Sequence, residues 1–81
     1  NYKPMSNLEP RAKIGDVVIV SKYYVQGCIE FGSSEFRVTN KYGPHGMFPD
    51  GYFESDQGNY DIHFDDKDIL KNLTTNKTYE S

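Results

Sequence analysis

The 81 residues are enough for one domain with one small core, because only 36% of them are hydrophobic. No apolar run is long enough to span a membrane, and the single cysteine, Cys28, excludes an internal disulfide. The net charge of −3 divides into +2 over residues 1–41 and −5 over residues 42–81, which disfavours general binding to nucleic acid. Seven tyrosines and five phenylalanines predict an aromatic-rich core.

The chain begins with a stretch that has no hydrophobic periodicity. Residues 1–12 contain two prolines and predict an extended N-terminal arm. This arm lacks the basic and then apolar layout of a signal peptide, so we expect a cytoplasmic protein. The β-branched run in residues 13–21 predicts the first strand, and residues 21–27 predict a connection that closes at Gly27.

The next stretch, residues 28–39, is predicted to be a hairpin that turns at residues 32–34, where the sequence is Gly-Ser-Ser. Cys28 is interpreted as a buried strand residue. The side chains expected to share the inward face are Ile29, Phe31, Phe36 and Val38.

The stretch KYGPHGMFPDGYFE, residues 41–54, combines turn-forming glycine and proline with apolar side chains. Two interpretations stay open. Met47 and Phe48 either fold back to plug one end of a barrel or protrude as a contact point. The end of the stretch, residues 52–54, predicts a fourth strand.

The clearest alternation in the chain follows a predicted turn over residues 55–59. It places Tyr60, Ile62 and Phe64 on one face of a strand and Asp61, His63 and Asp65 on the other. Residues 65–73 predict one or two helical turns, with Asp65 or Asp66 as the N-cap. The remaining residues, 74–81, are either a last strand or a C-terminal tail.

These elements predict an all-β fold, a small five-stranded barrel over residues 13–73 with one short helical turn near its C-terminus. The segments KIGDVVIV, GCIEF and YDIHFDDKDIL resemble the pattern of SH3-like small barrels of the KOW and Tudor-like kind, over about residues 13–71. The resemblance implies a domain that binds peptides, proteins or nucleic acids rather than an enzyme. The long segment 41–54 departs from the pattern.

The sequence offers little support for catalysis or metal binding. His45 and His63 are too far apart for a zinc pair, and the acidic turn 56–61 lacks the spacing of a calcium loop. Cys28 or a serine of the 32–34 turn, with His63 and Asp61, makes an unconvincing nucleophile and base. We therefore predict no enzyme, no metal and no cofactor.

Acidic and aromatic side chains are concentrated between residues 47 and 65, and the alternation puts several of them on one side of a strand. An acidic rim around aromatic anchors is the composition expected of a surface for a basic protein partner. The alternative without a binding function is a charged surface that keeps a small barrel soluble. The predicted partner-binding residues are Met47, Phe48, Asp50, Tyr52, Glu54, Asp56, Asp61, His63 and Asp65.

The functional prediction is a binding module without enzymatic activity. The composition, rich in Tyr, Asn and Asp, resembles that of bacteriophage accessory proteins that inhibit or redirect a host nucleic-acid-handling protein. One alternative is a subunit of a larger assembly, including a homo-oligomer. Another is a nucleic-acid-binding barrel with a basic, aromatic surface made of Arg11, Lys13, Lys22, Tyr23, Tyr24, Arg37 and Lys41.

Overall fold

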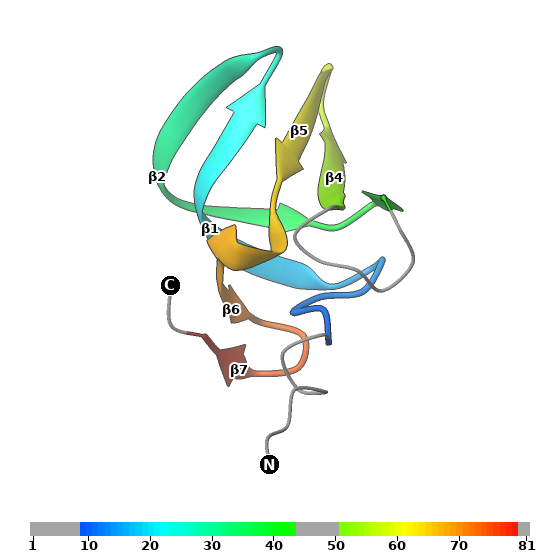
Figure 1. Cartoon of the computed structure of the whole chain (residues 1–81), viewed down its shortest axis with the longest axis vertical. Coiled ribbons are helices and arrows are strands. Elements are labelled where there is room, and N and C mark those ends of the chain that lie inside the picture. The colour runs from blue at the N-terminus through cyan, green and yellow to red at the C-terminus, as the bar shows by residue number, and fades with distance from the viewer. Residues whose placement is uncertain (1–8, 44–50, 80–81) are drawn as a thin grey trace.

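A computed structural model describes residues 9–43 and 51–79, which form a curled antiparallel sheet with the shape of a half-barrel (Figure 1). The predicted all-β fold is confirmed. The described residues contain seven strands, two more than expected, and one 3-10 turn (η1). Their bounds are β1 Val17–Val25, β2 Cys28–Arg37, β3 Asn40–Tyr42, β4 Tyr52–Gln57, β5 Tyr60–Phe64, η1 Asp66–Asp68, β6 Ile69–Asn72 and β7 Lys77–Thr78.

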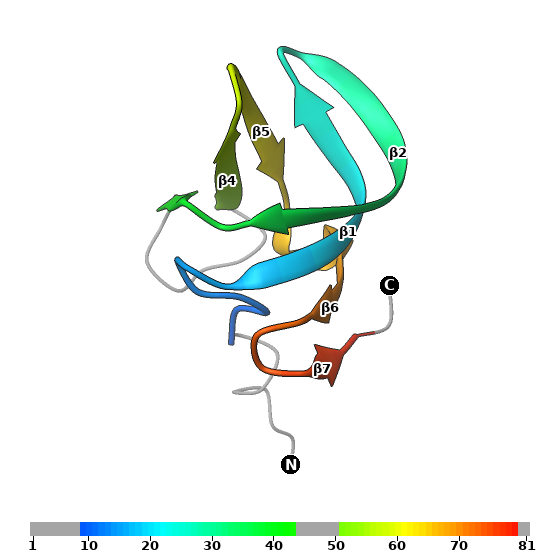
Figure 2. The same ribbon diagram turned by 180° about the vertical axis from the view of Figure 1, so that it is seen from behind.

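Strand β1 organises the sheet, whose order is β3-β4-β5-β1-β6-β7 with β2 on the other side of β1. The first half of β1 lies between β2 and β6, where Val18 pairs with Asn72. Its second half lies between β2 and β5, where Tyr24 pairs with His63. From both sides of the molecule, β1 and β2 are seen to curve together as one long ribbon, with the β4–β5 hairpin beside them (Figures 1 and 2).

The connection predicted over residues 21–27 is wrong, because β1 continues through it to Val25. The reversal occurs in two residues, Gln26 and Gly27, with φ of 51° and 84°. Two successive positive φ angles are the signature of a type I′ hairpin turn, whose twist matches that of the flanking strands. Gly27 therefore marks the turn itself.

The hairpin turn predicted at residues 32–34 is also wrong, because β2 runs through it as one strand. Between Val20 and Lys22 the pairing slips, so that Ser21 faces two residues of β2, Gly32 and Ser33. Gly32 has a φ of 131°, which a side chain would disfavour. The glycine thus permits a β-bulge that bends both strands instead of reversing the chain.

This bulge exchanges the two faces of β1, because Val18 and Val20 before it and Tyr23 and Val25 after it pack on the core. Ile29 and Phe31, predicted to face inward, are 49% and 77% exposed, because each shares a face with an outward residue of β1. Phe36 and Val38, on the other side of the bulge, are buried as predicted. Cys28 was predicted to be buried and is exposed beside the hairpin turn.

The core is aromatic, as the composition predicts. The Phe64 ring lies 5.9 Å from the rings of both Phe36 and Phe53, measured between centroids. Phe53 is fully buried. The other buried apolar residues are Ala12, Val18, Val20, Val38, Ile62 and Ile69.

Residues 69–72 of the segment predicted to be helical, 65–73, form β6, and only its N-terminal part is confirmed as the single turn η1. Its N-cap is Asp65, whose carbonyl accepts a 3.0 Å hydrogen bond from the Asp68 amide and whose amide donates a 3.1 Å bond to Asp68 Oδ2. Arg11 ties the segment before β1 to this turn, because its amide donates a 2.7 Å hydrogen bond to Asp66 Oδ1. Within the described residues no helix is long enough to cross a membrane.

Candidate functional site

The β4–β5 hairpin carries most of the predicted partner-binding residues on its outer face. Its two-residue turn has Gly58 at the first central position, which fixes the register so that Glu54 lies opposite His63. The buried residues Phe53 and Phe64 alternate with the outer residues and hold the hairpin on the core. The predicted residues that lie on this hairpin or directly after it are Tyr52, Glu54, Asp56, Asp61, His63 and Asp65. The other three, Met47, Phe48 and Asp50, lie outside the described residues.

Phe53, which lies between Tyr52 and Glu54 in the chain, belongs to the core and takes no part in this surface. Tyr42 of β3, by contrast, is exposed. Its ring lies 5.0 Å from that of Tyr52 and is stacked at an interplanar angle of 27°. The Tyr52 ring is in turn 5.0 Å from the His63 ring. We call these three side chains the aromatic stack.

Glu54 contacts two members of the aromatic stack, Tyr42 and His63. One carboxylate oxygen, Oε1, accepts a 3.0 Å hydrogen bond from the Tyr42 hydroxyl, and the other, Oε2, lies 3.3 Å from His63 Nε2. Asn40 Nδ2 donates a 3.0 Å hydrogen bond to the same Tyr42 hydroxyl. The carboxylate therefore fixes the orientation of one ring on each side of β4.

The same carboxylate alters the acidity of Tyr42. The hydrogen bond to Glu54 raises the pKa of the Tyr42 phenol, and burial and the negative charge of Glu54 act in the same direction. The phenol is therefore held in its protonated form, in which it donates to the carboxylate. Tyr42 presents a neutral ring face to solvent at neutral pH.

Asp56 and Asp61 lie directly opposite each other where the hairpin approaches its turn. Both are exposed. Like charges at directly opposed positions of an antiparallel pair destabilise the sheet. Their presence gives this end of the hairpin a concentrated negative charge.

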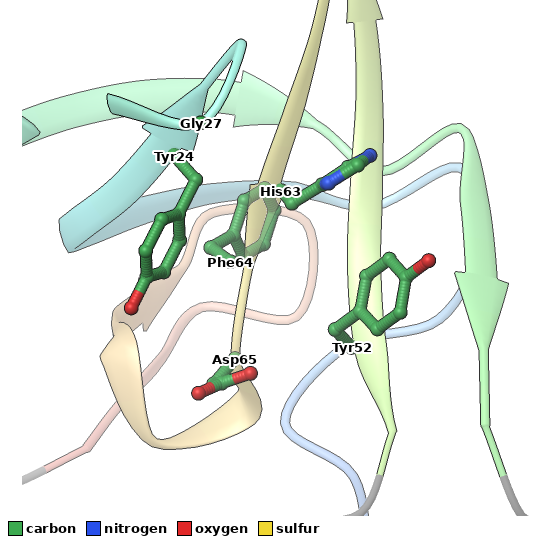
Figure 3. Close-up of a pocket in the computed structure, with 6 residues that line it drawn as sticks. All are labelled: Tyr24, Gly27, Tyr52, His63, Phe64 and Asp65. Carbon is green, nitrogen blue, oxygen red and sulfur yellow. The ribbon is translucent and has the colours of Figure 1, made fainter. Parts of the chain in front are cut away.

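A hollow of about 350 Å³ opens beside the aromatic stack, where the sheet splits (Figure 3). β1 pairs with β5 at Tyr24 and Val25, whereas nearer the N-terminus of β1 Val20 pairs with Ile69 of β6. The rings of Tyr24 and Tyr52 stand on either side of Phe64, and Asp65 lies at one end (Figure 3). The residues that line the hollow are Tyr24, Gly27, Tyr52, His63, Phe64 and Asp65.

The sequence did not identify Asn40 or Tyr24 as members of this surface. Tyr24 reaches it only because the bulge in the β1–β2 pairing turns its side chain outward. Lys22 lies on the same face, with its Nζ 5.8 Å from the centre of the Tyr24 ring. Asn40 reaches it through the pairing of β3 with β4, opposite Glu54. The glycine at position 32 was the available signal for the bulge.

Two basic residues of the alternative nucleic-acid surface donate hydrogen bonds to backbone carbonyls. Arg11 donates to the Ile69 carbonyl at 3.0 Å, and Arg37 donates to the Gly15 carbonyl at 3.0 Å. Tyr23 packs against the core residue Phe36, whereas the adjacent Tyr24 points outward. Tyr23 and Tyr24 therefore do not form one stacking platform.

The groups considered for chemistry are also separated. Within residues 9–43 and 51–79, no three His, Cys, Asp or Glu side chains are grouped so as to hold a metal ion. Cys28 lies beside the β1–β2 turn, whereas His63 of β5 contacts Glu54. No protein-family model, curated protein or solved structure matches the chain.

Proposed function

We propose that this protein is a non-enzymatic binding module whose outer β3–β4–β5 face contacts a basic surface of another protein. The face combines the aromatic stack with Glu54, Asp56, Asp61 and Asp65. Aromatic side chains supply contact area at low cost in conformational entropy, and the carboxylates supply complementary charge.

The observation that carries the proposal is the direct opposition of Asp56 and Asp61. This pair works against the stability of a very small domain, and a sequence selected only for folding would avoid it. Features that oppose stability are expected where function requires them. A basic partner would neutralise the repulsion on binding.

The target class follows from the charge and from the phage-like composition. An acidic, aromatic face suits the basic groove of a host nucleic-acid-handling protein, which it would inhibit or redirect by occupying the groove. On this proposal the protein acts in the cytoplasm of the host cell. Binding is expected to weaken steeply as salt concentration rises.

The test is capture of partners from a nuclease-treated bacterial lysate, followed by measured association with the purified partner. The double variant Asp56→Lys and Asp61→Lys should abolish capture and slow association. The matched control is Glu30→Lys with Glu35→Lys, which makes the same change of net charge at exposed positions of β2. Equal effects of the two double variants would show that capture and association depend only on the net charge of the protein.

Capture that survives reversal of Asp56 and Asp61 would refute the acidic-face proposal. Material that disappears from the untreated sample when nuclease is added would instead support the nucleic-acid alternative. Light scattering of the purified protein separates these outcomes from self-assembly, because a concentration-dependent rise in mass would indicate contacts between copies of the chain.

A further inference from the structure

We infer that the hollow between Tyr24 and Tyr52 receives an arginine side chain of the partner. This inference rests on the proposed function and specifies which chemical group of the basic partner the face recognises. The hollow of about 350 Å³ is at the small end of ligand sites, a size that suits one side chain better than a large molecule.

The walls of the hollow are suited to a cation. The rings of Tyr24 and Tyr52 flank it and Phe64 lies between them (Figure 3). The face of an aromatic ring attracts a cation placed within about 6 Å. The Tyr24 ring already interacts with one, because Lys22 Nζ lies 5.8 Å from its centre.

Asp65 supplies the negative charge at one end of the hollow. Its backbone is held by reciprocal hydrogen bonds with Asp68, so the carboxylate is carried by a fixed turn. Glu54, the nearest carboxylate on β4, already contacts Tyr42 and His63. Among the residues that line the hollow, Asp65 is the carboxylate.

Arginine matches this arrangement better than lysine. Its guanidinium is planar and weakly hydrated, so it can stack on an aromatic ring and at the same time donate two hydrogen bonds to one carboxylate. The ammonium of lysine is compact and strongly hydrated, and it satisfies only one of these requirements at a time. Two flanking rings with a carboxylate at the end therefore favour arginine.

The test is an NMR titration of the isotope-labelled, full-length protein with three blocked tripeptides, Gly-Arg-Gly, Gly-Lys-Gly and Gly-citrulline-Gly. Citrulline keeps the shape of arginine but has no charge. Arginine should shift the backbone signals of Tyr24, Tyr52 and Asp65 and bind roughly tenfold more tightly than citrulline, with lysine between them. Equal binding of arginine and citrulline would refute the inference.

Three variants locate the binding site. Asp65→Asn keeps the shape of the side chain and should weaken arginine binding roughly tenfold. Lys22→Gln removes the cation that competes for the Tyr24 ring and should strengthen binding. Tyr60→Leu, at an exposed position outside the hollow, should leave binding unchanged. Arginine binding that none of these variants alters would place the site elsewhere and refute the inference.

The inference and the proposed function can fail separately. If partner capture is lost on reversal of Asp56 and Asp61 but survives Asp65→Asn and Tyr52→Leu, the acidic face stands and the arginine site is refuted. If the tripeptide binds as expected but capture survives reversal of Asp56 and Asp61, the arginine site stands and the acidic-face proposal is refuted.

Discussion

Replacing Asn72 by leucine removes four hydrogen bonds at the end of β6. The side chain is 1% exposed, and its Nδ2 donates to the Arg11 carbonyl and to Asp16 Oδ2, each at 2.9 Å. Its Oδ1 accepts from the amides of Thr74 and Thr75 at 2.9 and 3.0 Å. One amide therefore joins the segment before β1 to the turn between β6 and β7.

The cost can be estimated from these contacts. Each hydrogen bond contributes about 1 kcal/mol net, so the loss of four costs about 4 kcal/mol. Burial of the leucine side chain offsets about 1–2 kcal/mol of this. The expected decrease in the free energy of unfolding is about 2–3 kcal/mol, a large part of the roughly 4–12 kcal/mol expected for a domain of this size.

Urea unfolding followed by far-ultraviolet circular dichroism measures this change, and thermal unfolding should show Tm lowered by roughly 10–20 °C. The control is Thr75→Leu, because the Thr75 side chain is exposed and only its amide contacts Asn72. Asn72→Asp adds a second test, since its carboxylate would face Asp16. A decrease below about 0.5 kcal/mol for Asn72→Leu would refute the reasoning, because it is no larger than the effect of an ordinary surface change.

Three further predictions concern stability. Burial raises the pKa of Asp66 above 3.8, although the hydrogen bond and charge of Arg11 act to lower it. The folded state thus binds this proton more tightly than the unfolded chain, and the resulting stabilisation is lost as pH rises from about 3.8 through the folded-state pKa. Urea unfolding at several pH values should show this loss for the original protein but not for Asp66→Asn. Profiles of the free energy of unfolding against pH that run parallel for the two proteins would contradict the prediction. Phe53→Ala should lower the free energy of unfolding by about 3–5 kcal/mol and Phe31→Ala by less than about 0.5 kcal/mol, and similar denaturation midpoints would show the burial assignment to be wrong. Asp61→Asn should raise the free energy of unfolding by about 0.2–1 kcal/mol while weakening partner binding, and a loss of stability would show that the acidic pair does not repel.

Elements whose conformation depends on residues adjacent in the chain could be predicted from the sequence. Alternation alone identified the buried and outer faces of β5, and the acidic residues after it indicated η1 with Asp65 as its cap. The glycines at positions 27 and 58 lie in the turns of the two hairpins, but both turns are shorter than predicted, because β1 continues to Val25 and β4 continues to Gln57. Each of these features is determined by a few consecutive residues, so a single sequence carries the signal.

The course of β1 and β2 could not be predicted in the same way. The bulge arises from the pairing of Ser21 with Gly32 and Ser33, which are more than ten positions away in the chain. Its effect is to exchange inner and outer faces over the second half of β1, so the outward position of Tyr24 follows from a long-range contact. Because this one-residue shift in register is not visible in the local sequence, the Tyr24 side of the hollow could not be predicted.

The two sides of the candidate surface differ in how well the sequence predicts them. On β5, period-two alternation placed His63 outward, and the two-residue hairpin turn brings it beside Tyr52 of β4. The contributions of Tyr42 and Tyr24 come from β3 and β1, and their positions follow from pairing that local pattern does not specify. The acidic residues were consequently easier to predict than the aromatic ones.

The β4–β5 hairpin places its core residues and the residues proposed to bind a partner on opposite faces. Phe53 and Phe64 hold its inner face in the core, and Glu54 and His63 alternate with them on the outer face. Because strand geometry directs the two sets to opposite sides, outer residues can change without leaving a cavity in the core. The opposed acids are the exception, since their repulsion acts on the hairpin itself. Stability and partner binding should therefore change in opposite directions when this pair is altered, and together when the core is altered.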